Sequence, residues 1–130
     1  MTFMENKNPI SPHIQIYSWH ISSLVSIGHR ITGVLNIIIL TLISVWLASL
    51  LLGELNYKII YNFLNSFIGK FFVIASIWSF IFHSLSELRH LFWDMGYGFD
   101  LKVSKLTGLI VILGSFLITI LVYLLGKHII

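Results

Sequence analysis

Two groups of ionisable residues interrupt long apolar runs in this chain. His29 and Arg30 stand at the start of one run, and His83, Arg89 and His90 stand near the end of the next. His83 and His90 are seven positions apart, which is two helical turns, so their backbones would lie nearly in line and about 10 Å apart. An imidazole among apolar neighbours needs partners for its ring nitrogens, because burying an unsatisfied polar group is costly.

Two kinds of partner would satisfy His83. One is a haem iron, since histidine is a common axial ligand in cytochromes, and His29, Arg30 and His90 would then be placed to pair with the haem propionates. The other is a hydroxyl group of a neighbouring helix, which requires no cofactor. His83 is the one histidine well inside an apolar run. A haem held by two histidines would therefore take its second ligand from another subunit, which predicts a partner membrane protein.

A second pattern lies around His29. Small and polar residues recur at the 3, 4, 7 spacing of one helical face, at Ser22, Ser26, His29, Arg30 and Gly33. A polar face on a membrane helix turns toward protein, ligand or water. The alternative is that Arg30 reaches anionic lipid while the small residues allow close helix packing.

The elements that must position these residues are membrane helices. The chain is 57% hydrophobic and 10% charged, more apolar than a water-soluble domain of 130 residues could bury. Residues 31–53 and 106–126 carry no charge, and residues 59–86 carry only Lys70. About 20 residues cross the bilayer as a helix, so each stretch can span it. We predict an all-α membrane protein with one transmembrane domain over 1–130, in which an interfacial segment (1–18) precedes helices at about 20–52, 59–90 and 104–127.

The composition excludes several classes of function. The sequence has no cysteine, which rules out disulfides and thiolate metal ligands. Its net charge of +3 comes from scattered Lys and Arg, so no basic run is available for nucleic acid. The polar N-terminus, with Pro9 and Pro12, is not typical of a cleaved signal peptide.

Three spans would bring the N-terminal segment and the loop near 89–105 to one side of the membrane. Five Lys and Arg fall on that side and three on the other, which favours an N-terminus in the bacterial cytoplasm or mitochondrial matrix. His29, Arg30 and His83 would then meet at one membrane face. Lys70, near the start of the second span, is expected to snorkel toward the opposite interface.

The motifs resemble those of a known family. Ser26 to Gly33, SIGHRITG, resembles the S-x-x-H-R-x-[ST]-G signature of the cytochrome b large membrane-anchor subunit of succinate dehydrogenase, respiratory complex II. The segment from His83 to Gly96, HSLSELRHLFWDMG, resembles that family's second signature, H-x-x-x-G-x-R-H-x-x-W-D-x-G. Ser11 to Tyr17, SPHIQIY, is similar to a third segment, S-P-H-L-x-I-Y. The three motifs occur in order and, with the spans, cover almost the whole chain.

The resemblance implies roles for individual residues. Ser26 and Arg30 match positions that bind ubiquinone, and His83 matches an axial ligand of haem b. His29, Arg30 and His90 match residues near the haem propionates, while Trp93 and Asp94 are expected to shape a loop facing the iron-sulfur subunit.

The same resemblance implies the setting of the chain. The other axial histidine would come from the small membrane-anchor subunit, which shares the haem, and the dehydrogenase chemistry would belong to a flavoprotein and an iron-sulfur subunit. The chain would help form the ubiquinone-reduction site in the inner membrane of a bacterium or mitochondrion, linking the tricarboxylic acid cycle to the respiratory chain.

Glu87 departs from the family pattern, because the second signature has glycine at this position. The carboxylate would pair with Arg89, His90 or Arg30, or narrow the haem site, or accept a proton from a ligating histidine. Two other functions stay open: a haem-free structural membrane anchor, and a proton-conducting membrane subunit that uses His83 and Glu87 as a relay.

Overall fold

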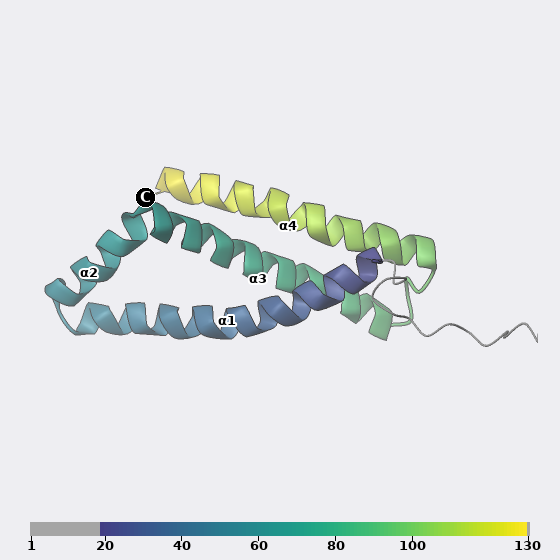
Figure 1. Cartoon of the computed structure of the whole chain (residues 1–130), viewed down its shortest axis with the longest axis horizontal. Coiled ribbons are helices and arrows are strands. Elements are labelled where there is room, and N and C mark those ends of the chain that lie inside the picture. The colour runs from purple at the N-terminus through teal and green to yellow at the C-terminus, as the bar shows by residue number, and fades with distance from the viewer. Residues whose placement is uncertain (1–18, 130) are drawn as a thin grey trace, which may run out of the picture.

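The structure is a computed structural model that describes the backbone of residues 19–129 and side chains up to residue 126. The expected interfacial segment (1–18) and the motif from Ser11 to Tyr17 lie outside the described residues. Four helices and no strand make up this part of the chain: α1 (Ile21–Leu51), α2 (Glu54–Asn65), α3 (Phe67–Asp94) and α4 (Leu101–Ile129). Figure 1 shows α3 between α1 and α4, with the short α2 bridging the far ends of α1 and α3.

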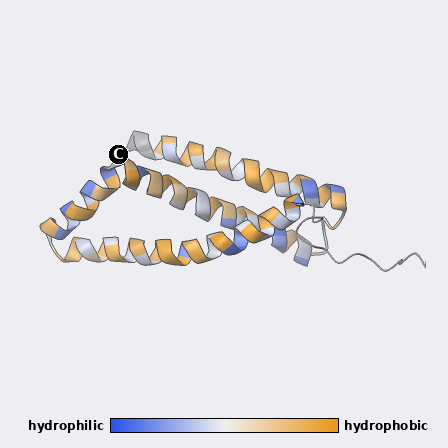
Figure 2. Cartoon of the chain, viewed as in Figure 1, coloured by the Kyte–Doolittle hydropathy of each residue, from blue (hydrophilic) through white to orange (hydrophobic). Residues whose placement is uncertain are grey.

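Three of the four helices are long and apolar enough to cross a membrane. They are α1, α3 and the Leu101–Gly126 part of α4, which confirms the predicted all-α fold with three spans. Their large apolar side chains are mostly exposed, and Figure 2 shows hydrophobic residues along the length of each long helix. Lipid is the solvent for such surfaces, so the exposure costs nothing in a bilayer.

The predicted second helix, 59–90, is wrong in its first part. Residues 54–65 form the separate helix α2, and α3 begins only at Phe67. Ser66 is extended, with φ −67° and ψ 164°, and its hydroxyl accepts a hydrogen bond from the Gly69 N–H at 3.1 Å, which caps α3. A Cβ at Gly69 would collide with the Phe63 carbonyl, so this tight corner requires glycine.

The contacts between the helices are largely polar. Val25, Phe82 and Val111 form a small apolar cluster where α1, α3 and α4 meet. Around it, the Ser79 hydroxyl donates to Oδ1 of Asn36 at 2.8 Å, and Trp78 Nε1–H donates to the Ser115 hydroxyl at 3.1 Å. In a membrane, apolar surface alone does not drive helices together, so helix association depends more on close packing and interhelical hydrogen bonds.

The two ends of the bundle differ in what they enclose. α1 and α3 diverge toward α2, as Figure 1 shows, and an apolar cavity of about 450 Å³ lies between these three helices. No ionisable side chain lines it. At the opposite end α1 and α3 converge, and the histidines of the sequence motifs lie there. The candidate haem-binding residues therefore lie at one end of the bundle.

Candidate functional site

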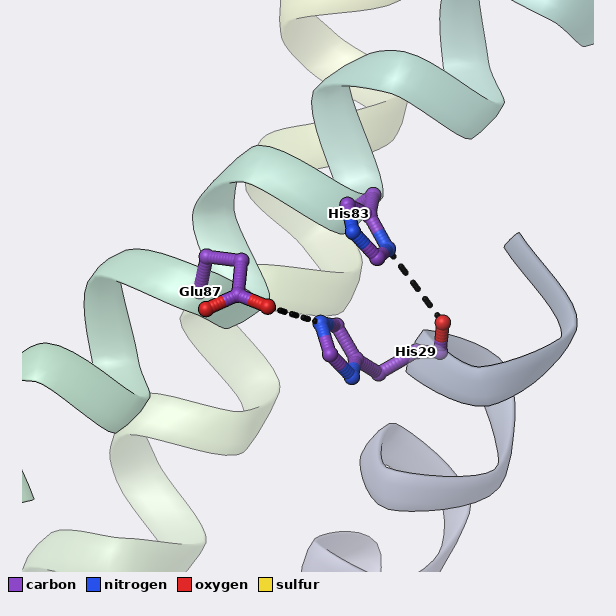
Figure 3. A group of neighbouring side chains, drawn as sticks. All are labelled: His29, His83 and Glu87. Atoms are coloured by element: carbon purple, nitrogen blue, oxygen red, sulfur yellow. Dashed lines mark hydrogen bonds and ion pairs between the residues drawn. The ribbon is translucent and has the colours of Figure 1, made fainter. Parts of the chain in front are cut away.

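Helices α1 and α3 bring three of the predicted histidines together. The rings of His29 and His83 stack with their centroids 4.2 Å apart and their planes 6° from parallel. The His90 ring lies 5.2 Å from that of His29. His29 comes from α1 and the other two from α3, so residues more than 50 positions apart in sequence form one cluster, seen in part in Figure 3.

Glu87 belongs to this cluster and pairs with His29. Its Oε1 lies 2.8 Å from Nε2 of His29, and Figure 3 marks this contact with a dashed line. The Glu87 side chain is 57% exposed, against 21% for His29. Of the alternatives given for Glu87, the structure shows neither the pairing with Arg89 nor those with His90 and Arg30, and it shows the carboxylate beside a histidine nitrogen. The carboxylate instead holds a histidine that stacks on His83, because one helical turn separates Glu87 from His83 on the face of α3 toward α1.

The surroundings of His83 determine which of its nitrogens carries the proton. Nδ1 lies 3.2 Å from the backbone oxygen of His29 and 3.3 Å from the hydroxyl of Thr32. A carbonyl oxygen only accepts, so a hydrogen bond to it requires the proton on Nδ1, and in that tautomer Nε2 is the nitrogen that a ligand could use. Metal-bound histidines characteristically donate their second ring N–H to such an acceptor. His83 therefore has the tautomer that a metal ligand requires.

Gly33 allows α1 to approach His83 closely. A Cβ at this position would lie 3.3 Å from Cε1 of His83, tighter than an ordinary van der Waals contact. At Gly28, five residues earlier on the helix, a Cβ would lie 2.8 Å from the Phe82 ring. The two glycines of the first motif thus serve helix packing, and this packing brings the His29 carbonyl within reach of His83.

The donor set fits one axial ligand of a haem and no more. His83 offers an anchored imidazole with a free Nε2, as a b-type haem requires. His29 cannot supply the opposite ligand in this arrangement, because two rings stacked face to face do not lie on opposite sides of an iron. The ligand atoms of His29, His83 and Glu87 all lie within 4.8 Å of one another, so a small cation is a chemical alternative.

Ser26 and Arg30 lie one turn apart on α1 and are open to the surroundings. Arg30 is exposed and Ser26 half-buried. Neither side chain makes a hydrogen bond or ion pair with another described residue. The predicted polar face of α1 is therefore divided: Ser22 and His29 are engaged by other helices, while Ser26 and Arg30 are available to a ligand. Lys70 is exposed at the other end of the bundle, as snorkelling requires.

Arg89, which the sequence analysis considered only as a possible partner of Glu87, connects helices in the structure. Its side chain is buried, with the residue only 5% exposed, and it joins three helices. Nε–H donates to the Thr107 hydroxyl at 3.1 Å, and Nη2–H donates to the hydroxyls of Ser22 and Ser104 at 3.1 and 3.0 Å and to the Ser104 carbonyl at 2.9 Å. Its guanidinium carbon lies 4.1 Å from the centre of the Trp93 ring. The sequence did contain a signal for this role, because hydroxyl residues stand near the start of both α1 and α4.

Trp93 in turn fixes the connection between α3 and α4. Its Nε1–H donates to the Gly98 carbonyl at 3.2 Å, and Gly96 and Gly98 have φ values of 87° and 84° that favour glycine. This geometry agrees with the expected role of Trp93 in shaping the loop. Asp94 is exposed at the end of α3.

Comparisons with known proteins give the family of this chain. Residues 4–122 match the family described as succinate dehydrogenase/fumarate reductase transmembrane subunit. The chain is similar to the succinate dehydrogenase cytochrome b556 subunit of Rickettsia felis, with 40% identity over 91% of this chain and 92% of the relative. It is also similar to the cytochrome b556 subunit of Paracoccus denitrificans, with 31% identity over 87% of both chains.

A mitochondrial relative shows the same likeness. The succinate dehydrogenase cytochrome b560 subunit of Homo sapiens is 32% identical over 82% of this chain and 68% of its own length. The family match over residues 4–122 covers α1, α2, α3 and most of α4, and so includes every residue of the histidine cluster. The chain belongs to the succinate dehydrogenase/fumarate reductase transmembrane subunit family.

Proposed function

We propose that this chain anchors a succinate dehydrogenase in the membrane, holds haem b and helps form the ubiquinone-reduction site. The observation that carries the haem assignment is the contact of His83 Nδ1 with the His29 carbonyl at 3.2 Å, which leaves the other ring nitrogen, Nε2, to a ligand. The names of the relatives, cytochrome b556 and b560 subunits, support the same assignment.

His83 would be the axial ligand that this chain contributes. The haem, when bound, supplies a carrier for one electron. His29 and His90 lie beside His83 and would bind the propionates together with Arg30, the exposed cation of α1. Because the His29 ring stacks on that of His83, a second histidine that would hold the haem is expected from another chain, which we assign to the small membrane-anchor subunit.

Ser26 and Arg30 would bind ubiquinone. A serine hydroxyl and a guanidinium can both donate to a quinone carbonyl, and the arginine keeps its charge at every relevant pH. Arg30 would thus stabilise the negative charge that develops on the quinone during reduction. Its exposure and its freedom from other described partners support access from the lipid phase.

The rest of the complex would supply the electrons. Succinate oxidation requires a flavoprotein and an iron-sulfur subunit, and the chain has no cysteine for a cluster of its own. We place the complex in the inner membrane of a bacterium or mitochondrion, with the end that holds the histidine cluster and the N-terminus on the cytoplasmic or matrix side.

The haem assignment is tested by a dithionite-reduced minus oxidised spectrum of the gently solubilised complex. We expect a b-type band in the wild type that disappears in His83→Ala. Ser84→Ala is the matched control, because Ser84 is exposed, adjacent in sequence and bonded only to the Phe80 carbonyl among the described residues. An unchanged band in His83→Ala would contradict the assignment.

The quinone assignment is tested by Arg30→Ala. We expect quinone reduction to fall at least tenfold, while succinate oxidation by a water-soluble artificial acceptor is retained. Lys70→Ala removes an exposed cation from the same bundle and should change neither rate. Equal loss of both activities in Arg30→Ala would indicate failed assembly and would contradict a specific role in quinone binding.

A haem-free anchor is the second candidate, and Glu87 favours it. The carboxylate stands where the family signature has glycine and lies within 4.8 Å of a histidine ligand atom, in the space beside His83. A wild-type complex that reduces quinone and shows no b-type band would establish this alternative. A proton relay across the membrane lacks comparable support, because the cavity at the α2 end has no ionisable lining residue.

A further inference from the structure

Arg89 carries a positive charge that no described residue neutralises. It lies within the α3 span and is 5% exposed, yet every hydrogen-bond partner is a hydroxyl or a carbonyl. Its Nη1 makes no hydrogen bond within residues 19–126, and no carboxylate in this part of the chain pairs with it. A charge removed from water requires compensation, and in a membrane an ionisable residue indicates a functional partner.

A groove beside Arg89 offers space for that partner. It lies between α3 and α4, has a volume of about 430 Å³ and is walled mainly by apolar and aromatic side chains. We call it the Arg89 groove; its lining residues are Leu85, Leu88, Arg89, Phe92, Trp93, Tyr97, Gly98, Val103, Thr107, Ile110 and Val111. Among the described residues, Arg89 is the one charged residue that lines it. The groove is separate from the histidine cluster, which lies between α1 and α3.

The depth of Arg89 suits the headgroup region of the bilayer. Arg89 is five residues from the end of α3 at Asp94, or roughly 7 Å along the helix axis. Trp93, in the last turn of α3, and Tyr97, in the loop that follows, line the same groove, and such aromatic residues favour the membrane interface. Farther into the membrane, Ile110 and Val111 extend the apolar wall along α4.

We propose that the Arg89 groove binds an anionic phospholipid. The lipid phosphate accepts from the Nη1 edge of Arg89, and an acyl chain lies against the apolar walls. Charge complementarity selects an anion, because the guanidinium has no counter-ion among the described residues. The apolar walls select a lipid over a water-soluble anion, because only a lipid brings a phosphate and a hydrocarbon chain together.

The test compares lipid retention by the intact purified complex. The complex is reconstituted in vesicles of equal parts dioleoylphosphatidylglycerol and dioleoylphosphatidylcholine, re-extracted, and its retained lipids are counted by native mass spectrometry. We expect the wild type to retain phosphatidylglycerol at least fivefold better than Arg89→Gln does. Lys102→Gln, which removes an exposed cation outside the groove at the start of α4, should stay within twofold of the wild type.

A second variant keeps the proposal testable if Arg89→Gln does not assemble. Ile110→Trp fills the groove without touching a hydrogen bond of Arg89, and it should also lower phosphatidylglycerol retention at least fivefold. Equal retention of both lipids by the wild type would overturn the proposal. So would displacement of the lipid by millimolar inorganic phosphate, or a partner-subunit carboxylate found cross-linked to Arg89.

Discussion

The two sides of α3 use polar residues in opposite ways. Toward α1, His83 and Glu87 join His29 in a cluster of titratable groups, with the carboxylate more than half exposed. Toward α4, Arg89 lies in a buried network of hydroxyls that cannot titrate near neutral pH. The two sites are six residues apart on one helix, yet one is open to the surroundings and the other is enclosed by three helices.

The difference indicates how stability and function are divided. The Arg89 network connects α1, α3 and α4 through several hydrogen bonds, so it determines how these helices are positioned relative to one another. The histidine cluster connects only α1 and α3, and it leaves Nε2 of His83 free of protein hydrogen bonds among the described residues. A rigid network on one side of α3 therefore supports a reactive cluster on the other. Substitutions in the two regions should separate stability from cofactor binding.

The largest effect on stability is expected for Arg89→Met. The variant loses the four hydrogen bonds that the buried guanidinium makes to Ser22, Ser104 and Thr107, so unfolding should become easier by about 3 kcal/mol. Detergent-induced unfolding of the purified complex measures this change. Lys102→Met removes an exposed cation and should be nearly neutral. A stable Arg89→Met complex would show that the partner subunits, and not this network, hold the helices together.

Gly33→Val should act on the histidine cluster through packing. The added side chain begins 3.3 Å from Cε1 of His83, so the ring or α1 must move, at a cost of about 2 kcal/mol. The b-type band of the complex should shift or weaken along with the loss of stability. Gly114→Ala, where the new Cβ lies 3.7 Å from Leu85, is the control and should leave the spectrum unchanged. A Gly33→Val spectrum identical to that of the wild type would contradict the assignment of His83 as a haem ligand.

Glu87→Gln should change stability by less than about 1 kcal/mol. The Glu87 side chain is 57% exposed, so water screens its pair with His29, and the amide can still accept from the ring. Unfolding of the complex measures the change, and Glu87→Leu, which removes the acceptor, should cost slightly more. A loss of stability as large as that of Arg89→Met would show that the histidine cluster stabilises the fold as much as the Arg89 network does.

The smallest effect is expected on α2. Lys58 lies 2.6 Å from Glu54 in an exposed pair one turn apart, and Lys58→Gln should cost no more than roughly 0.5 kcal/mol. The same unfolding measurement at low and high salt checks this, because screening should abolish the difference. An effect that persists at high salt would mean that Lys58 contacts another subunit.

The sequence predicted the spans well because the signal is local. Uncharged runs long enough to cross a bilayer specify membrane helices without knowledge of their neighbours, and the helices of the structure follow. The division between α2 and α3 escaped this reasoning, because the apolar stretch continues through Ser66 and the corner depends on the Ser66 hydroxyl, which caps α3 by accepting from the Gly69 N–H. The motif residues around His29 and His83 were also visible in sequence, since spacing and composition mark them.

What the sequence alone determined is the membrane class, the three spans and the candidate residues at one end of them. Tertiary structure decided which of those residues meet. The pairing of Glu87 with His29, the proton on Nδ1 of His83 and the burial of Arg89 all depend on how closely α1, α3 and α4 approach one another. That approach is set by glycines and hydroxyls on three different helices. No local pattern specifies it, because each contact joins residues that are distant in the chain.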